Sequence, residues 1–186
     1  MPYGVKAAEV CRNCKTVKMV TQACPACGGG ILDHTISLSD YLTDFPERYP
    51  DQFSKEIKEN AIILLNKVNK LVTLVRKPFN FSWSVTSGWR PAAYNASIGG
   101  SLRSRHITGE AIDLHDPDFW LQRHLTIENP DLLRVCDLAM EDPAYCMYEN
   151  ADKSRGGWVH LQSVLPRSGN RVFIPYPGPP VVRKKN

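Results

Sequence analysis

Two histidines and one aspartate in the second half of the chain have the residue types of a catalytic metal site. His106 and Asp113 lie seven residues apart with Gly109 between them, and His160 follows later. On one straight strand this odd spacing would put the first two on opposite faces, but a bend at the glycine would bring both to one point. Two imidazoles and one carboxylate with an open fourth position match the ligand plan of a catalytic zinc ion. We therefore take His106, Asp113 and His160 as candidate metal ligands.

Spacing alone leaves other interpretations of these residues open. A histidine beside apolar strand residues is more often a hydrogen-bonded structural residue, and an aspartate at a strand end is more often a cap or turn residue. His115, Asp116 and Asp118 also form a rival cluster that could bind a metal on its own. The pattern by itself does not choose between these sites.

Four of the six cysteines form two Cys-x-x-Cys pairs near the N-terminus, Cys11 with Cys14 and Cys24 with Cys27. Thiolates spaced in this way can point at one ion, and two such pairs complete a tetrahedral zinc site. The segment is too short to bury a core, so a metal would have to hold it together. Two disulfides are the alternative, which an origin in the cytoplasm disfavours. We predict a zinc ribbon with a structural zinc ion over residues 1–35.

Hydrophobic periodicity predicts the elements that must position the candidate ligands. Apolar residues recur at three- and four-residue steps over 51–76, which indicates a long amphipathic helix. Alternating residues over 81–86 indicate a strand, and two further short strands are expected at 111–114 and 158–162. A short helix with proline at its start is expected over 91–97.

The predicted fold class is α+β. In strands 111–114 and 158–162 the aliphatic residues on either side of Asp113 and His160 would face the core, which leaves both candidate ligands on the open face. We assign the ribbon to 1–35, the main domain to 36–175 and a basic, Pro-rich tail to 176–186. Residues 32–50 are expected to form a linker and docking arm.

The net charge of +4 is concentrated in the C-terminal segment. Five Lys and Arg residues and no acidic residue follow position 165, which leaves 18 basic and 19 acidic residues before it. Such a tail could touch anionic polymers, although a solvated terminus is the more common role. No segment approaches the roughly 18–20 apolar residues of a membrane span, and the N-terminus lacks the apolar region of a secretory signal. We expect synthesis in the cytoplasm.

Three blocks of the sequence resemble the zinc D-Ala-D-Ala carboxypeptidases and the phage-type L-alanyl-D-glutamate endopeptidases. In chain order the blocks are VTSGWRP at 85–91 with Asn95, SRHITGEAID at 104–113, and WVH at 158–160. These enzymes share a metallopeptidase fold with the hedgehog signalling domain. The resemblance covers roughly residues 40–175 and implies a small antiparallel sheet with packed helices.

The resemblance also implies roles for particular residues. His106, Asp113 and His160 would bind the catalytic zinc ion, in addition to the structural zinc of the ribbon. Arg90 would hold the substrate carbonyl or the oxyanion, and Ser104 would be a hydrogen-bond partner near the metal. These roles agree with elementary chemistry, because zinc polarises a carbonyl and activates water, and a fixed guanidinium stabilises a developing oxyanion.

The catalytic base is the point at which the chain departs from this family's pattern. Many members carry a carboxylate three residues before the last histidine, where this chain has Gly157. Another branch has its acid further upstream, and Glu149 fits that arrangement. Glu149 would act as general base on the zinc-bound water and then as acid toward the leaving amine, with Glu141 and Asp152 as alternatives.

These residues predict a zinc-dependent peptidase that hydrolyses an amide bond in the peptide stem of bacterial peptidoglycan. A phage lysis enzyme (endolysin), released through a membrane hole or carried in a virion, would reach that substrate without a signal peptide. The alternative is a non-catalytic zinc-binding module for the cell wall or for a protein partner, with the ribbon as the interaction site. Nucleic-acid binding by the ribbon ranks third, because its cations are not accompanied by aromatic residues after Tyr3. The pattern does not select between carboxypeptidase and endopeptidase action.

Overall fold

The computed structural model falls into two compact units, Met1–His34 and Thr35–Asn186. It describes residues 8–10, 17–19, 36–75, 83–116, 118–142 and 157–174. In the first unit, strand β1 (Ala8–Val10) pairs antiparallel with strand β2 (Val17–Met19). The four cysteines of the predicted ribbon, Cys11, Cys14, Cys24 and Cys27, lie outside the described residues, so the ribbon stays a prediction.

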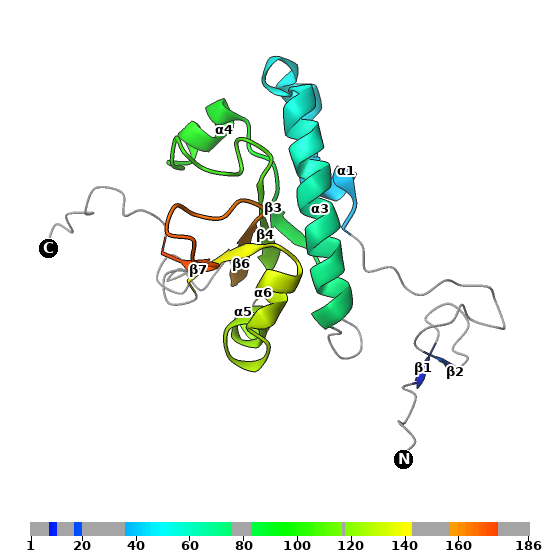
Figure 1. Cartoon of the computed structure of the whole chain (residues 1–186). Coiled ribbons are helices and arrows are strands. Elements are labelled where there is room, and N and C mark those ends of the chain that lie inside the picture. Colours follow the sequence, from blue (N-terminus) through cyan, green and yellow to red (C-terminus); the bar gives the residue numbers. More distant parts are fainter. Residues whose placement is uncertain are drawn as a thin grey trace, which may run out of the picture. The chain divides into compact units, whose positions relative to one another are not determined.

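The second unit is built on a five-stranded sheet with the order β3-β4-β6-β5-β7 (Figure 1). Its strands are β3 (Val85–Ser87), β4 (Ala111–His115), β5 (Ala139–Glu141), β6 (Trp158–Gln162) and β7 (Val172–Phe173). Neighbouring strands pair antiparallel, except that β5 and β7 pair parallel. This mixed sheet with its helices confirms the predicted α+β class, and the two predicted ligand strands are the adjacent strands β4 and β6.

Helix α3 (Lys55–Val75) supplies most of one side of the core, as the periodicity predicts. Its buried side chains recur every three or four residues: Ala61, Leu64, Leu65, Val68, Leu71, Val72 and Val75. They join one cluster with the aliphatic residues of the two central strands: Ile112, Leu114, Val159 and Leu161. The helix begins later than predicted, because residues Pro50–Gln52 form a separate 3₁₀ turn, η1.

Residues 36–50 belong to the domain core, which corrects the predicted linker and docking arm. They form helices α1 (Leu38–Leu42) and α2 (Phe45–Arg48). Tyr41 is fully buried and its hydroxyl donates a hydrogen bond to the Ala111 carbonyl oxygen at 3.0 Å. The prediction rested on Pro46 and Pro50, which suggested irregular chain. Pro46 instead lies in the first turn of α2 and Pro50 opens η1, positions where proline is tolerated.

The remaining helices are short and connect the strands. Helix α4 (Ala92–Ser97) follows Pro91, close to the predicted bounds. Helix α5 (Trp120–Arg123), the π-helical turn η2 (His124–Glu128) and helix α6 (Asp131–Val135) lie between β4 and β5. Within the described part of the chain, no helix combines the length and apolar character that crossing a membrane requires.

The buried Tyr41 hydroxyl provides a test of whether residues 36–50 are part of the core. Tyr41→Phe should lower the free energy of unfolding by about 1–2 kcal/mol, because it removes the donor of a buried hydrogen bond and leaves the shape of the side chain unchanged. Urea unfolding measures the change. Tyr94→Phe is the matched control, because the Tyr94 hydroxyl makes no hydrogen bond to any described residue; equal stability of the two variants would contradict the assignment.

Candidate metal centre

The candidate site lies along one row of side chains that crosses the sheet. Asp113 of β4 is paired with Ser87 of β3 on one side and His160 of β6 on the other. The β5–β6 register, extended by one residue, puts Glu141 opposite His160, and Glu141 is paired with Phe173 of β7. Directly opposed residues share a face of the sheet. The row therefore lies on the face opposite the aliphatic residues that pack against α3.

His106 reaches this row from the turn before β4. Gly109 has a φ of +78°, and a Cβ there would lie 2.6 Å from the Ile57 carbonyl oxygen, so the turn requires glycine for its conformation and for space. This is the bend that the spacing of His106 and Asp113 predicts. The His106 side chain is 2% exposed, and its Nδ1 donates to the Gly88 carbonyl oxygen at 2.7 Å. Because a carbonyl can only accept, Nε2 carries the lone pair that faces the row.

Helix α1 supports the carbonyl group that orients His106. A Cβ at Gly88 would collide with the carbonyl oxygen of Tyr41, so only glycine allows the two chain segments to approach this closely. The next residue, Trp89, donates its backbone N–H to the same Tyr41 oxygen at 3.2 Å. The tautomer of His106 is therefore fixed by a segment that is itself held against the core.

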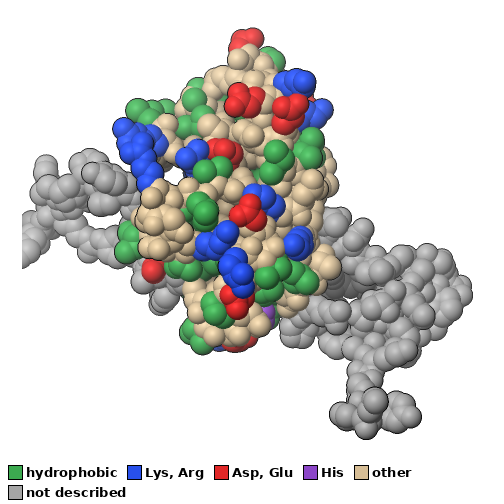
Figure 2. All heavy atoms as spheres, in the orientation of Figure 1, with side chains coloured by type: hydrophobic (Ala, Val, Ile, Leu, Met, Phe, Trp, Pro, Cys, Tyr) green, Lys and Arg blue, Asp and Glu red, His purple; other side chains and the backbone are tan. Residues whose placement is uncertain are grey.

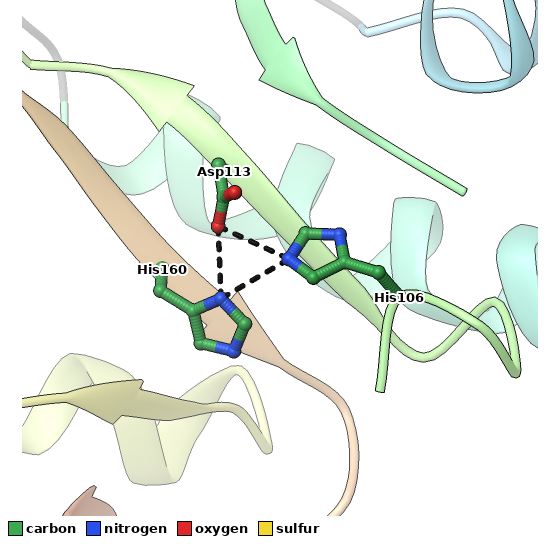
Figure 3. Close-up of side chains that lie close together, drawn as sticks. All are labelled: His106, Asp113 and His160. Atoms are coloured by element: carbon green, nitrogen blue, oxygen red, sulfur yellow. Dashed lines mark hydrogen bonds and ion pairs between the residues drawn. The ribbon is translucent and has the colours of Figure 1, made fainter. Parts of the chain in front are cut away.

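Three ligand atoms converge at the centre of the row (Figure 3). His160 Nδ1 lies 2.8 Å and His106 Nε2 lies 3.2 Å from Asp113 Oδ1, and the two nitrogens are 3.3 Å apart. Zinc bonds of about 2.0–2.1 Å at tetrahedral angles place ligand atoms about 3.3 Å apart. The three atoms thus fit one face of a zinc tetrahedron. We call this group the His/Asp/His site.

Burial and mutual contacts set the ionisation of the three groups. Burial lowers the pKa of His106 and outweighs the opposing effect of Asp113. For Asp113, burial raises the pKa, but the charge and hydrogen bonds of His106 and His160 outweigh it and hold the pKa well below its usual range. Burial also lowers the pKa of His160, but the hydrogen bond and charge of Asp113 outweigh it and leave that pKa raised. A neutral His106 and an ionised Asp113 are the forms that bind a metal.

Arg90 is part of the site and contacts a predicted ligand directly. Its Nη2 donates to Asp113 Oδ2 at 2.6 Å, and its Nε donates to Ser87 Oγ at 2.6 Å. The Arg90 side chain is 18% exposed, so it also borders the open side of the row. The resemblance points to the SGWR segment, which contains both Ser87 and Arg90, but it does not predict that Arg90 contacts Ser87 and Asp113.

The remaining predicted residues are placed unevenly. Ser104 lies in the turn before His106, and within the described residues its hydroxyl makes no hydrogen bond to the His/Asp/His site. Glu149 and Asp152 lie outside the described residues. Glu141 is described, is 8% exposed, and stands beside His160 in the row. It is therefore the candidate base whose position the structure gives.

Gly157 shows why a carboxylate cannot stand at the position that many members of the resembling family use. A Cβ at Gly157 would lie 2.5 Å from the Asp116 carbonyl oxygen and 3.1 Å from the Phe119 ring. The Asp116 backbone N–H also donates to the Gly157 carbonyl oxygen at 2.8 Å. Any side chain at this position would separate the two segments, so the carboxylate of that pattern has no place here.

The rival cluster of His115, Asp116 and Asp118 is not brought together as a metal site. Asp116 is fully buried, and its two carboxylate oxygens accept the backbone N–H groups of Leu121 and Gln122, each at 3.0 Å. It therefore fixes the start of helix α5, which is the structural role common for an aspartate after a strand. Among the described residues, the ligand atoms that converge are those of the His/Asp/His site.

Comparison with known proteins agrees with this geometry. Residues 48–128 match the family model described as Peptidase M15. The matched segment contains Arg90, His106 and Asp113, so these three residues lie in the part of the chain that is similar to Peptidase M15. No curated protein and no solved structure gives a significant match to the chain.

Metal content distinguishes the His/Asp/His site from its rival. His160→Ala should release one equivalent of zinc, because two protein ligands do not hold a catalytic zinc ion with high affinity. His115→Ala is the matched control, a histidine on the adjacent strand β4, and should keep the wild-type zinc content. Elemental analysis of the purified variants gives the answer. Loss of zinc in His115→Ala, with wild-type zinc content in His160→Ala, would instead assign the site to His115, Asp116 and Asp118.

Proposed function

We propose that this chain is a zinc-dependent peptidase that hydrolyses an amide bond in the peptide stem of bacterial peptidoglycan. The observation that carries the proposal is the convergence of His106 Nε2, Asp113 Oδ1 and His160 Nδ1 at zinc-like spacing. Two of these residues lie in the segment that is similar to Peptidase M15. Three ligands that leave a fourth position open suit catalysis rather than a closed structural site.

The chain's own groups would carry out the steps around the metal. His106, Asp113 and His160 would hold the zinc ion, which when bound polarises the scissile carbonyl and lowers the pKa of water. The Gly88 carbonyl oxygen accepts a hydrogen bond from Nδ1–H of His106, which leaves the lone pair on Nε2 for the metal. Arg90, at the open side of the row, would orient the substrate carbonyl and stabilise the oxyanion. Ser104 would hydrogen-bond to the bound substrate.

A carboxylate would move the proton. It would take a proton from the attacking water and give it to the leaving amine as the amide bond breaks. We propose Glu149 for this role on its sequence pattern. Glu141 is the alternative that geometry supports, because it is buried beside His160, and Asp152 is the third candidate.

Isosteric amides identify the base among these carboxylates. Glu149→Gln should lower kcat by about 10²–10⁴-fold with the zinc content unchanged, because the amide cannot accept the proton. Glu141→Gln and Asp152→Asn are the matched comparisons and should keep most of the turnover. Stopped assays on a defined stem peptide give kcat for each variant. A large loss in Glu141→Gln alone would move the role to β5.

The N-terminal unit and the tail have proposed roles outside catalysis. Cys11, Cys14, Cys24 and Cys27 would bind a second, structural zinc ion, and the ribbon so formed would contact the cell wall or a protein partner. The described face of the molecule in Figure 2 carries interspersed acidic and basic side chains rather than a continuous cationic surface. We propose that the enzyme reaches the wall as a phage lysis enzyme released through a membrane hole, or as part of a virion.

Mass spectrometry of peptidoglycan fragments tests the proposed reaction. Incubation with the wild-type protein should give a new product, and a chelator should abolish it because the catalytic metal is removed. The mass of the product identifies the bond, and so separates D,D-carboxypeptidase from L,D-endopeptidase action. Absence of any product across several wall chemistries would favour the non-catalytic binding module.

A further inference from the structure

We propose that Arg90 is a positioning residue for the metal ligand Asp113, a role separate from any contact with substrate. The inference rests on the proposed zinc site. It is based on the different partners of the two oxygens of the buried Asp113 carboxylate. Asp113 Oδ1 faces the two histidines, whereas Oδ2 accepts a hydrogen bond from Arg90.

The Arg90 contact fixes the rotation of the Asp113 carboxylate. The Asp113 side chain is 7% exposed, and Arg90 is the only described residue that donates to its Oδ2. Without the guanidinium, this oxygen would be a buried acceptor with no described donor, which is unfavourable. The carboxylate would then gain by turning Oδ2 toward the histidines or the metal. Arg90 therefore reserves Oδ1 for the metal.

Arg90 is in turn held by contacts of its side chain and of its main chain. Its Nε donates to Ser87 Oγ, and Ser87 is the residue of β3 that is paired with Asp113. The backbone N–H of Arg90 donates to the carbonyl oxygen of His106 at 3.2 Å. Arg90 Nη2 also lies 3.2 Å from His106 Nε2. One residue thus contacts two of the predicted ligands, Asp113 through its side chain and His106 through both its side chain and its main chain.

Only arginine can make both side-chain contacts. A guanidinium presents several N–H donors in one rigid plane, whereas a lysine ammonium is a single point charge on a flexible stem. Nη1 of Arg90 makes no hydrogen bond to any described residue. It stays available for a substrate oxygen, so the positioning role and the proposed substrate role can coexist on one side chain.

Zinc affinity in the absence of substrate separates these two roles. Arg90→Ala should weaken zinc binding at the His/Asp/His site by about 10–100-fold, the usual effect of losing a group that orients a metal ligand. Arg90→Lys should recover part of the loss, because it keeps the charge without bridging Ser87 and Asp113. Ser87→Ala should show a smaller loss in the same direction. Arg103→Ala is the control, because Arg103 is exposed and makes no ion pair with a described residue.

The affinity is measured on the full chain by competition with a chelator of known strength. The zinc that His160→Ala loses defines the site and separates it from zinc bound to the cysteines. The visible spectrum of the cobalt-loaded protein adds a second readout, because a rotated carboxylate changes the ligand field whereas a lost substrate contact does not. Circular dichroism checks that each variant is folded. If Arg90→Ala does not fold, the zinc affinity of Ser87→Ala still tests the inference.

Wild-type zinc affinity and cobalt spectrum in both Arg90→Ala and Ser87→Ala would overturn the inference, even if turnover fell. That result would leave Arg90 as a substrate contact and the proposed function intact. Absence of site zinc in the wild-type protein would instead overturn the proposed function, and this inference with it.

Discussion

One buried carboxylate sets the arrangement of the whole site. The Asp113 side chain is 7% exposed, and a charge at that depth is tolerated only where neighbouring groups compensate for lost water. The compensating groups come from three separate segments: the turn before β4, strand β6 and the residues that follow β3. The hydrogen bonds and ion pairs of this one carboxylate therefore bring together parts of the chain that are distant in sequence.

The rest of the domain serves to hold that carboxylate in place. The aliphatic residues that flank Asp113 and His160 on β4 and β6 are fully buried on the other face of the sheet, where they pack with α3. Helix α1 closes against Gly88 and so supports the carbonyl group that orients His106. Because successive side chains of a strand point to opposite faces of the sheet, the packing of the core on one face fixes the positions of Asp113 and His160 on the other.

The central part of this structure is predictable from sequence because its signals are local. The period of α3 and the alternation around Asp113 and His160 can be read within a few residues, and the bend at Gly109 follows from the odd spacing. Strands β5 and β7 are too short for alternation to be informative. The place of Glu141 beside His160 depends on strand register, which is a long-range property. Helix α1 is too short for a clear period, and α2 was missed because its Pro46 lies in the first turn of the helix and does not break it.

The cross-strand row also makes tolerance of insertions very uneven along the chain. A one-residue insertion in β6 before His160 would reverse every side chain beyond it, so that His160 would enter the core and an aliphatic neighbour would take its place beside Asp113. An insertion between β5 and β6, by contrast, leaves the paired residues of both strands with their partners. The pairing of β4 with β6, which holds Asp113 beside His160, is therefore the part of the sheet least able to absorb a change in length.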